Sequence, residues 1–131
     1  MLTLDMSPLT RLGKAFADPT RVRLLALLRG RELCVCELCD VLGVAQSTLS
    51  THLQVIRDSG LVRTRKQGKW VYYAPAPETE ALLEQLFHFF EKPLGVDPKL
   101  RRDLDRLKKR VGEREDGKCC RGFDSTQRRQ T

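Results

Sequence analysis

Three of the chain's five cysteines lie between Cys34 and Cys39, in the run Glu-Leu-Cys-Val-Cys-Glu-Leu-Cys of residues 32–39. Thiols this close together can be half-cystines, buried small hydrophobic side chains, or ligands of a thiophilic ion. Disulfides are the weakest interpretation, because Cys34 and Cys36 are too close for a relaxed bridge and the N-terminus does not resemble a secretory signal. We therefore expect a cytoplasmic protein, in which an odd number of cysteines favours ligands or reactive thiols.

The spacing of these cysteines sets a geometric condition on any shared ion. On a regular helix, at about 100° per residue, Cys36 and Cys39 share a face, whereas Cys34 and Cys36 point about 200° apart. Three sulfurs then meet around one ion only if the first turn of the helix distorts. An ion that prefers three thiolates would stabilise the distorted helix, so the run is a candidate switch for whatever that helix supports.

The segment after the cysteines has the pattern of a helix-turn-helix, with a short helix over 36–42, a tight turn over 43–45 and a second helix over 46–59 that ends at Gly60. Leu49, Leu53 and Ile56 form its apolar stripe. The remaining side chains are short hydroxyls and amides, which suit hydrogen bonds to base edges and phosphates in a major groove. They are Gln46, Ser47, Thr48, Ser50, Thr51 and Gln54. A solvated face with serine and threonine caps is the alternative.

A basic β-hairpin is predicted next, from two segments rich in Val, Tyr and Trp at 61–64 and 70–74, with 66–69 as the loop. Its positive side chains, with no acid between them, are Arg63, Arg65, Lys66 and Lys69. Such a tip can lie along a DNA backbone or in a minor groove, where neutralised phosphates give a salt-dependent affinity. An edge hairpin whose charges oppose aggregation is the alternative.

Four stretches together carry a family resemblance: the cysteine run, Gln46-Ser-Thr-Leu-Ser-x-His-Leu53, Gly60-Leu-Val62, and Arg65-Lys-Gln-Gly-Lys-Trp-Val-Tyr-Tyr73. Over about residues 8 to 77 the chain resembles the arsenic-responsive repressors of the ArsR/SmtB winged-helix family. The resemblance implies a mainly α-helical, homodimeric winged helix-turn-helix with a small β-hairpin. It also implies an inducer, As(III) or Sb(III), held by Cys34, Cys36 and Cys39.

The same resemblance implies that double-stranded operator DNA is the partner. Its contacts would come from the second helix of the motif, including His52, and from the hairpin residues Arg65, Lys66, Gln67 and Lys69. A histidine that stabilises the turn by a hydrogen bond is the alternative for His52. Near the start of an earlier helix, Arg21 and Arg23 are further candidates for phosphate contacts, or else a solvated rim.

The identity of the ion leaves alternatives. Structural zinc usually takes four Cys or His ligands, yet His52 and His88 are the only histidines and neither lies in the cysteine run. Three thiolates suit a soft, trigonal ion. The alternatives are a soft divalent metal such as Cd(II), Pb(II) or Zn(II), or As(III) bound mainly at Cys119 and Cys120. That pair could also help to capture the ion, or be a reactive pair without a role; neighbouring positive charge favours its thiolate form.

Four further helices are predicted over 8–17, 19–30, 78–91 and 99–111, with Ser7, Asp18 and Asp97 as N-caps before prolines. The helix over 78–91 has a wide apolar side that one small domain cannot easily bury. Homodimerisation through the first helix and the C-terminal helices is the economical explanation, with 99–111 extending the contact. The two helix-turn-helix motifs of such a dimer would then require an approximately palindromic operator.

Length and composition bound the remaining possibilities. A chain of 131 residues with 40% hydrophobic residues can build one modest core, so we expect one DNA-binding and dimerisation domain over 1–111 and a flexible tail over 112–131. No apolar run approaches the ~20 residues that span a bilayer. A net charge of +7 makes a polyanion a suitable partner.

Two other classes of protein compete with this interpretation. The first is a winged helix that binds only proteins, against which the basic hairpin argues. The second is a thiol reductase, because Cys36 and Cys39 have Cys-x-x-Cys spacing, but the chain lacks the βαβ pattern of a thioredoxin-like fold. We therefore expect that the protein is not an enzyme.

Overall fold

The computed structural model describes residues 6–115 and 117–119. It is mostly helical, with a small antiparallel sheet. The helices are α1 (Ser7–Ala15), α2 (Pro19–Leu28), α3 (Val35–Leu42), α4 (Gln46–Asp58), the 3-10 helix η1 (Pro77–Thr79), α5 (Glu80–Phe89), α6 (Glu91–Gly95) and α7 (Pro98–Val111). The strands are β1 (Leu33–Cys34), β2 (Val62–Gln67) and β3 (Trp70–Pro75). The helix-turn-helix and hairpin predictions are confirmed.

The predicted caps are confirmed at two helices out of the three. Asp18 accepts a hydrogen bond from the backbone N–H of Thr20 at 2.8 Å, and Asp97 accepts one from Lys99 at 2.9 Å. At α1 the predicted cap is wrong, because the helix begins one residue earlier and Met6 occupies the N-cap position. The helix predicted over 78–91 is divided among η1, α5 and the start of α6.

The sheet contains a strand that the sequence analysis missed. Its order is β1-β3-β2, and β1 pairs with β3 through Leu33 opposite Tyr73 and Cys34 opposite Tyr72. The hairpin turn is tighter than predicted, with only Gly68, at φ +59°, and Lys69 between the strands. Because β1 ends at Cys34, this residue precedes the helix, and the 200° divergence of Cys34 from Cys36, which holds only on a regular helix, does not apply.

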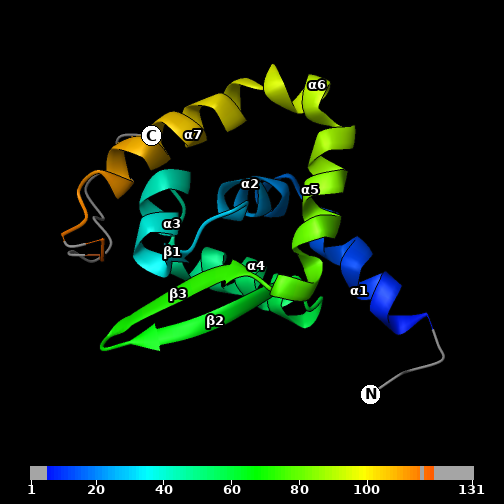
Figure 1. Cartoon of the computed structure of the whole chain (residues 1–131), viewed down its shortest axis with the longest axis horizontal. Helices are drawn as coiled ribbons and strands as arrows, with labels where there is room; N and C mark the ends of the chain where they lie inside the picture. Colours follow the sequence, from blue (N-terminus) through cyan, green and yellow to red (C-terminus); the bar gives the residue numbers. More distant parts are fainter. Residues whose placement is uncertain (1–5, 116, 120–131) are drawn as a thin grey trace.

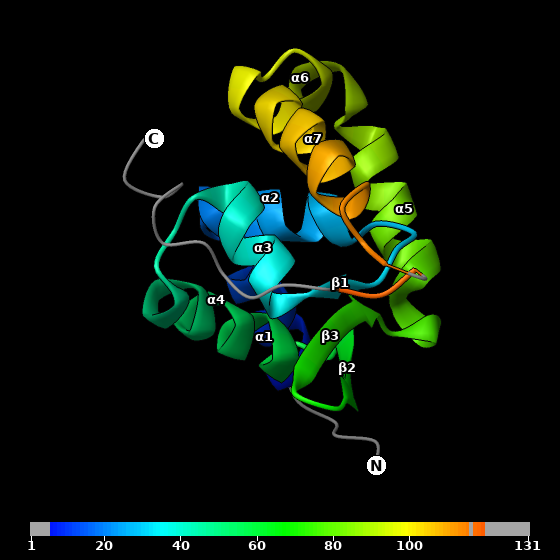
Figure 2. The same cartoon turned by 90° about the vertical axis from the view of Figure 1, so that its left-hand side faces the viewer.

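Helix α2 lies in the middle of the molecule, with α4 and the hairpin on one side and α7 on the other (Figures 1 and 2). Its leucines are fully buried and form the centre of the core: Leu24, Leu25, Leu27 and Leu28. Helix α7 packs against α2 and α3 within the chain and buries Leu100 and Leu107. Those two leucines are therefore used inside the chain, while Leu104 of the same stripe stays exposed.

Ion pairs fasten α7 to the earlier helices. The carboxylate of Asp103, buried on α7, accepts hydrogen bonds from Arg23 Nε at 2.7 Å and Nη2 at 2.8 Å. Arg23, a candidate for a phosphate contact or a solvated rim, is instead held by Asp103, with its side chain 18% exposed. A second pair joins Arg110 Nε to Asp40 of α3 at 2.8 Å.

No helix within the described ranges combines the length and apolar character needed to cross a membrane.

Candidate functional site

Helix α4 presents the predicted reading face. Its apolar stripe is buried, whereas the polar side chains proposed for DNA contact are exposed at Gln46, Ser47, Thr48, Ser50, Thr51 and Gln54. Helix α3 sets the position of this face through the intervening turn. Gly43 ends α3 in the left-handed region at φ +68°, and its N–H donates to the carbonyl of Cys39 at 2.9 Å. Only glycine adopts that conformation without strain, so the turn fixes the direction in which α4 leaves α3.

His52 is half-buried on α4 and contacts α2. Its Nδ1 lies 3.2 Å from Arg21 Nη1, and the same guanidinium donates to the carbonyl of Lys14 at 2.8 and 3.0 Å. The histidine therefore joins α4 to α1 and α2 through Arg21. This arrangement differs from the turn-stabilising hydrogen bond considered above; a DNA contact by His52 stays a prediction.

Some basic side chains of the hairpin pair with other residues of the protein, and others are exposed to solvent. Arg65 donates to the carboxylate of Glu32 at 2.6 and 3.0 Å and lies over the ring of Tyr72, 4.7 Å from its centroid. This hydrogen bond holds the pKa of Glu32 below its usual range. Sequence reasoning did not identify Glu32 as a partner. Lys66 and Lys69 are exposed and form the basic part of the wing, and Gln67 between them is partly exposed.

The cysteine run is split between two environments. Cys34 lies in a small cluster with Tyr72 and Cys119, against which Cys36 packs. Burial raises the pKa of the Cys34 thiol. Cys39 is instead fully buried in the main core. The structure therefore brings a cysteine from the far end of the chain next to Cys34.

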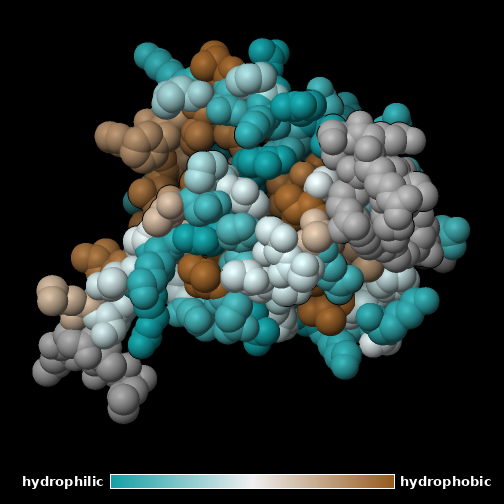
Figure 3. Space-filling model, turned by 180° about the vertical axis from the view of Figure 1, so that it is seen from behind, coloured by the Kyte–Doolittle hydropathy of each residue, from teal (hydrophilic) through white to brown (hydrophobic). Residues whose placement is uncertain are grey.

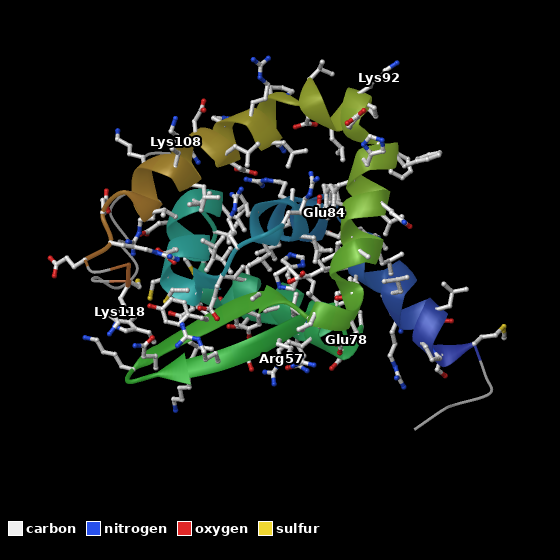
Figure 4. The ribbon with its side chains drawn as sticks, in the orientation of Figure 1. Arg57, Glu78, Glu84, Lys92, Lys108 and Lys118 are labelled. Carbon is white, nitrogen blue, oxygen red and sulfur yellow. The ribbon has the colours of Figure 1, made fainter. Side chains whose placement is uncertain are left out.

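The segment after α7 carries Cys119 to this cluster. A turn at Gly117, with φ +72°, and a backbone pairing of Glu115 with Lys118 fold the segment back. The N–H of Cys119 then donates to Tyr72 Oη at 3.0 Å. Figure 4 places Lys118 between the end of α7 and the β-hairpin. Cys120 and the rest of the predicted flexible tail, residues 120–131, lie outside the described residues.

Glu37 links the start of α3 to the same segment. Its side chain is fully buried, and Oε1 accepts a hydrogen bond from the N–H of Cys34 at 2.8 Å. Both carboxylate oxygens also accept hydrogen bonds of 2.6 Å from Arg114, whose Nη2 donates to the carbonyl of Glu32 at 2.9 Å. No sequence pattern indicated this pair, because its members lie 77 residues apart in the chain.

Within residues 6–115 and 117–119, no three Cys, His, Asp or Glu side chains are already arranged to hold a metal ion.

An open apolar groove runs between α1 and α5. It is lined by Leu9, Leu12, Phe16, Leu86, Phe90 and Pro93, among others. Leu9 is 72% exposed and Phe90 48% exposed, although both are large hydrophobic side chains. Figure 3 shows hydrophobic side chains gathered on this side of the molecule. The apolar patch predicted for the unpaired chain is therefore present.

Comparisons with known proteins agree with these features. Residues 18–64 match the family described as bacterial regulatory protein, arsR family. The chain is 47% identical over 72 residues to the arsenical resistance operon repressor of Escherichia coli K12, covering 54% of this chain and 62% of that protein. It thus spans less than two thirds of that relative. An uncharacterized helix-turn-helix transcriptional regulator of Methanocaldococcus jannaschii is 44% identical over 61 residues, covering 46% of this chain and 68% of that protein.

A solved structure gives the same result for the fold. The homodimeric winged helix-turn-helix DNA-binding domain of Mb0332 from Mycobacterium bovis superposes with a TM-score of 0.61 at 30% identity, covering 71% of this chain and 87% of that one. The matched family segment contains the helix-turn-helix and ends in β2, the first strand of the hairpin wing. This chain therefore belongs to the arsR family of bacterial regulatory proteins and has a winged helix-turn-helix fold.

Proposed function

We propose that the protein is a transcriptional repressor that binds operator DNA as a homodimer and leaves it when As(III) or Sb(III) binds cysteine thiolates, so that a resistance operon is derepressed. The observation that carries the proposal is the position of α3. This helix has Cys34 and Cys36 at its start and the turn to the reading helix α4 at its end. The name of the Escherichia coli relative supports the choice of inducer.

The mechanism follows from that position. An ion that binds Cys34 and Cys36, with a third sulfur from Cys39 or from the C-terminal pair, pulls on the first turn of α3. Glu37, whose carboxylate accepts a hydrogen bond from the N–H of Cys34, belongs to that turn. A shift of α3 reaches α4 through Gly43 and displaces the reading face from the groove. Coupling of about 1–3 kcal/mol would weaken DNA binding by about 5- to 150-fold.

The direct test is fluorescence anisotropy of the full chain on labelled DNA from upstream of its own coding region. Titration with arsenite or antimonite should release the DNA, with an apparent affinity lower by about 5- to 150-fold. Cd(II), Pb(II) and Zn(II) are parallel arms that test the divalent alternative. A chain that binds no DNA, or that stays on DNA at saturating arsenite and antimonite, would contradict the proposal.

The wing should bind DNA phosphates through Lys66 and Lys69. Replacing both with alanine should weaken operator binding and make the dependence of log K on log salt shallower by about 0.9 for each phosphate that is no longer neutralised. Anisotropy at several salt concentrations measures this slope. Lys108→Ala/Lys109→Ala is the matched control, because these exposed lysines belong to α7, which lies on the other side of α2 from α4 (Figure 1). If the salt dependence of log K were unchanged in the wing variant, Lys66 and Lys69 would not contact DNA phosphates.

The groove between α1 and α5 supports the proposed homodimer. Phe90→Asp would bury a carboxylate among apolar side chains, at a cost above about 1–3 kcal/mol, so dimerisation should weaken by about tenfold or more. Sedimentation velocity over a concentration series measures the shift toward monomer. Val96→Asp is the control, since Val96 is 73% exposed but does not line the groove. Equal dimerisation of the two variants would rule out this groove as the interface.

A further inference from the structure

We propose that Cys119, rather than Cys39, supplies the third sulfur for As(III), together with Cys34 and Cys36. This inference rests on the function proposed above and specifies its ligand set. The site would then join the start of α3 to the segment that follows α7.

The first argument is that the three cysteines already pack together in one cluster. Cys34 lies beside both Cys36 and Cys119, and the three belong to one small cluster bounded by Tyr72 and Trp70. Because Cys34 is at the end of β1 and Cys36 is in the first turn of α3, their side chains can face the same space. The cluster therefore brings Cys34, Cys36 and Cys119 to one place in the fold, where a rearrangement of their side chains would let the three sulfurs share one ion.

The second argument is the cost of using Cys39. Its side chain is 0% exposed and packs in the main core with residues such as Leu38 and Val41. Although Cys36 and Cys39 are three positions apart on α3, turning the Cys39 sulfur toward the ion would empty a packed site. Partly relaxed cavities in a core are destabilising. The structure thus gives Cys39 the part of a small hydrophobic side chain.

The third argument is that Cys119 is held in place by specific contacts. Its N–H donates to Tyr72 Oη at 3.0 Å, and Arg110 Nη2 lies 3.8 Å from its sulfur. Arg114, just before it, bonds to the buried carboxylate of Glu37 at 2.6 Å. These contacts place a thiol from the end of the chain next to the start of α3.

The binding step balances without a redox partner. Arsenous acid carries three hydroxyl groups on As(III). Three As–S bonds form and three As–O bonds break, and each thiol proton leaves with one hydroxyl as water. The arsenic and the sulfurs keep their oxidation states, and the trigonal product matches the three sulfurs of the cluster.

Two full-length double variants test the ligand set. Cys39→Ala/Cys120→Ser keeps Cys34, Cys36 and Cys119 as its only cysteines, whereas Cys119→Ser/Cys120→Ser keeps Cys34, Cys36 and Cys39. X-ray absorption at the arsenic edge counts As–S bonds in each arsenite-loaded protein. We expect three in the wild type and in the first variant, and two in the second. Arsenite affinity of the second should fall by at least about 100-fold, since losing a partner of a metal ligand alone costs about 10- to 100-fold.

The outcomes separate this inference from the proposed function. Three As–S bonds in the Cys119→Ser/Cys120→Ser protein, or fewer than three in the Cys39→Ala/Cys120→Ser protein, would overturn the assignment of Cys119 while arsenite sensing stands. No As–S bonds in the wild type would overturn both. Thermal unfolding of each variant beside the wild type checks that the fold is kept. The two variants remove different thiols. If one of them fails to fold, the As–S bond counts of the other variant and of the wild type still decide whether Cys119 is a ligand.

Discussion

Serine at both Cys34 and Cys36 is expected to abolish the release of operator DNA by arsenite while leaving operator affinity near that of the wild type. Both residues belong to the ligand set completed by Cys39 and to the one completed by Cys119, and a serine hydroxyl does not replace a thiolate for a soft ion. The exposed face of α4 and the wing are untouched. The full response of about 5- to 150-fold should therefore disappear. Anisotropy with and without arsenite measures both affinities on the same DNA.

The control for this variant is Cys39→Ala, which also changes α3 but leaves the cluster of Cys34, Cys36 and Cys119 intact. It should bind operator DNA and release it on addition of arsenite. Release by arsenite from the Cys34→Ser/Cys36→Ser protein would show that the sensing site lies elsewhere. A loss of DNA binding before arsenite is added would mean instead that the thiols are needed to keep the helix-turn-helix in its DNA-binding conformation.

Local patterns were sufficient to predict most of the fold. Asp18 and Asp97 cap helices at the positions where Asp-Pro occurs in the sequence, because both the cap and the proline act within one turn. The stripe of Leu49, Leu53 and Ile56 places α4 against the core and fixes which side chains remain exposed. Periodicity and capping are properties of neighbouring residues, so a single sequence is enough to read them.

Contacts between distant residues were beyond that reasoning. Strand β1 consists of Leu33 and Cys34 alone, too short for an alternating pattern, and it exists because β3 offers a partner. Its presence is what turns Cys34 out of the helix and toward Cys119. The pairs of Glu37 with Arg114 and of Arg23 with Asp103 likewise join helices far apart in the chain. Charge alone did not distinguish these arginines from ones that could reach DNA.

This difference matters for how the proposed sensor would work. With a site made only from residues 34–39, an ion would act inside one helix. With Cys119 as a ligand, it would act between α3 and the segment after α7. Arg110 at the end of α7 and Arg114 in that segment already bind Asp40 and Glu37 of α3. Binding of the ion would then either weaken or strengthen the contact between α3 and the C-terminal segment, a contact that is already formed without the ion. The strength of that interface is therefore a measurable property of the switch.

The pair of Arg110 and Asp40 should contribute most to that interface, since both side chains are only 3% exposed. Asp40→Ala leaves a buried guanidinium without its carboxylate, and removing one partner of a buried pair costs about 3–5 kcal/mol. Burial lowers the pKa of Arg110, whereas the hydrogen bond to Asp40 raises it. Because a guanidinium stays protonated in proteins, the positive charge of Arg110 persists when Asp40 is removed. Contacts of Arg110 with Glu113 and Cys119 favour the lower end of that range.

Urea unfolding at one fixed protein concentration measures this loss, because the stability of a dimer depends on concentration. The matched control is Glu84→Ala, which breaks the pair with Arg29, whose side chains are 37% and 55% exposed. An exposed pair is worth about 0–1 kcal/mol, so the two variants should differ by several-fold in their effect on the free energy of unfolding. If Asp40→Ala cost no more than Glu84→Ala, α7 would not be anchored to α3 through this pair. The C-terminal segment would then need another anchor to hold Cys119 beside Cys34.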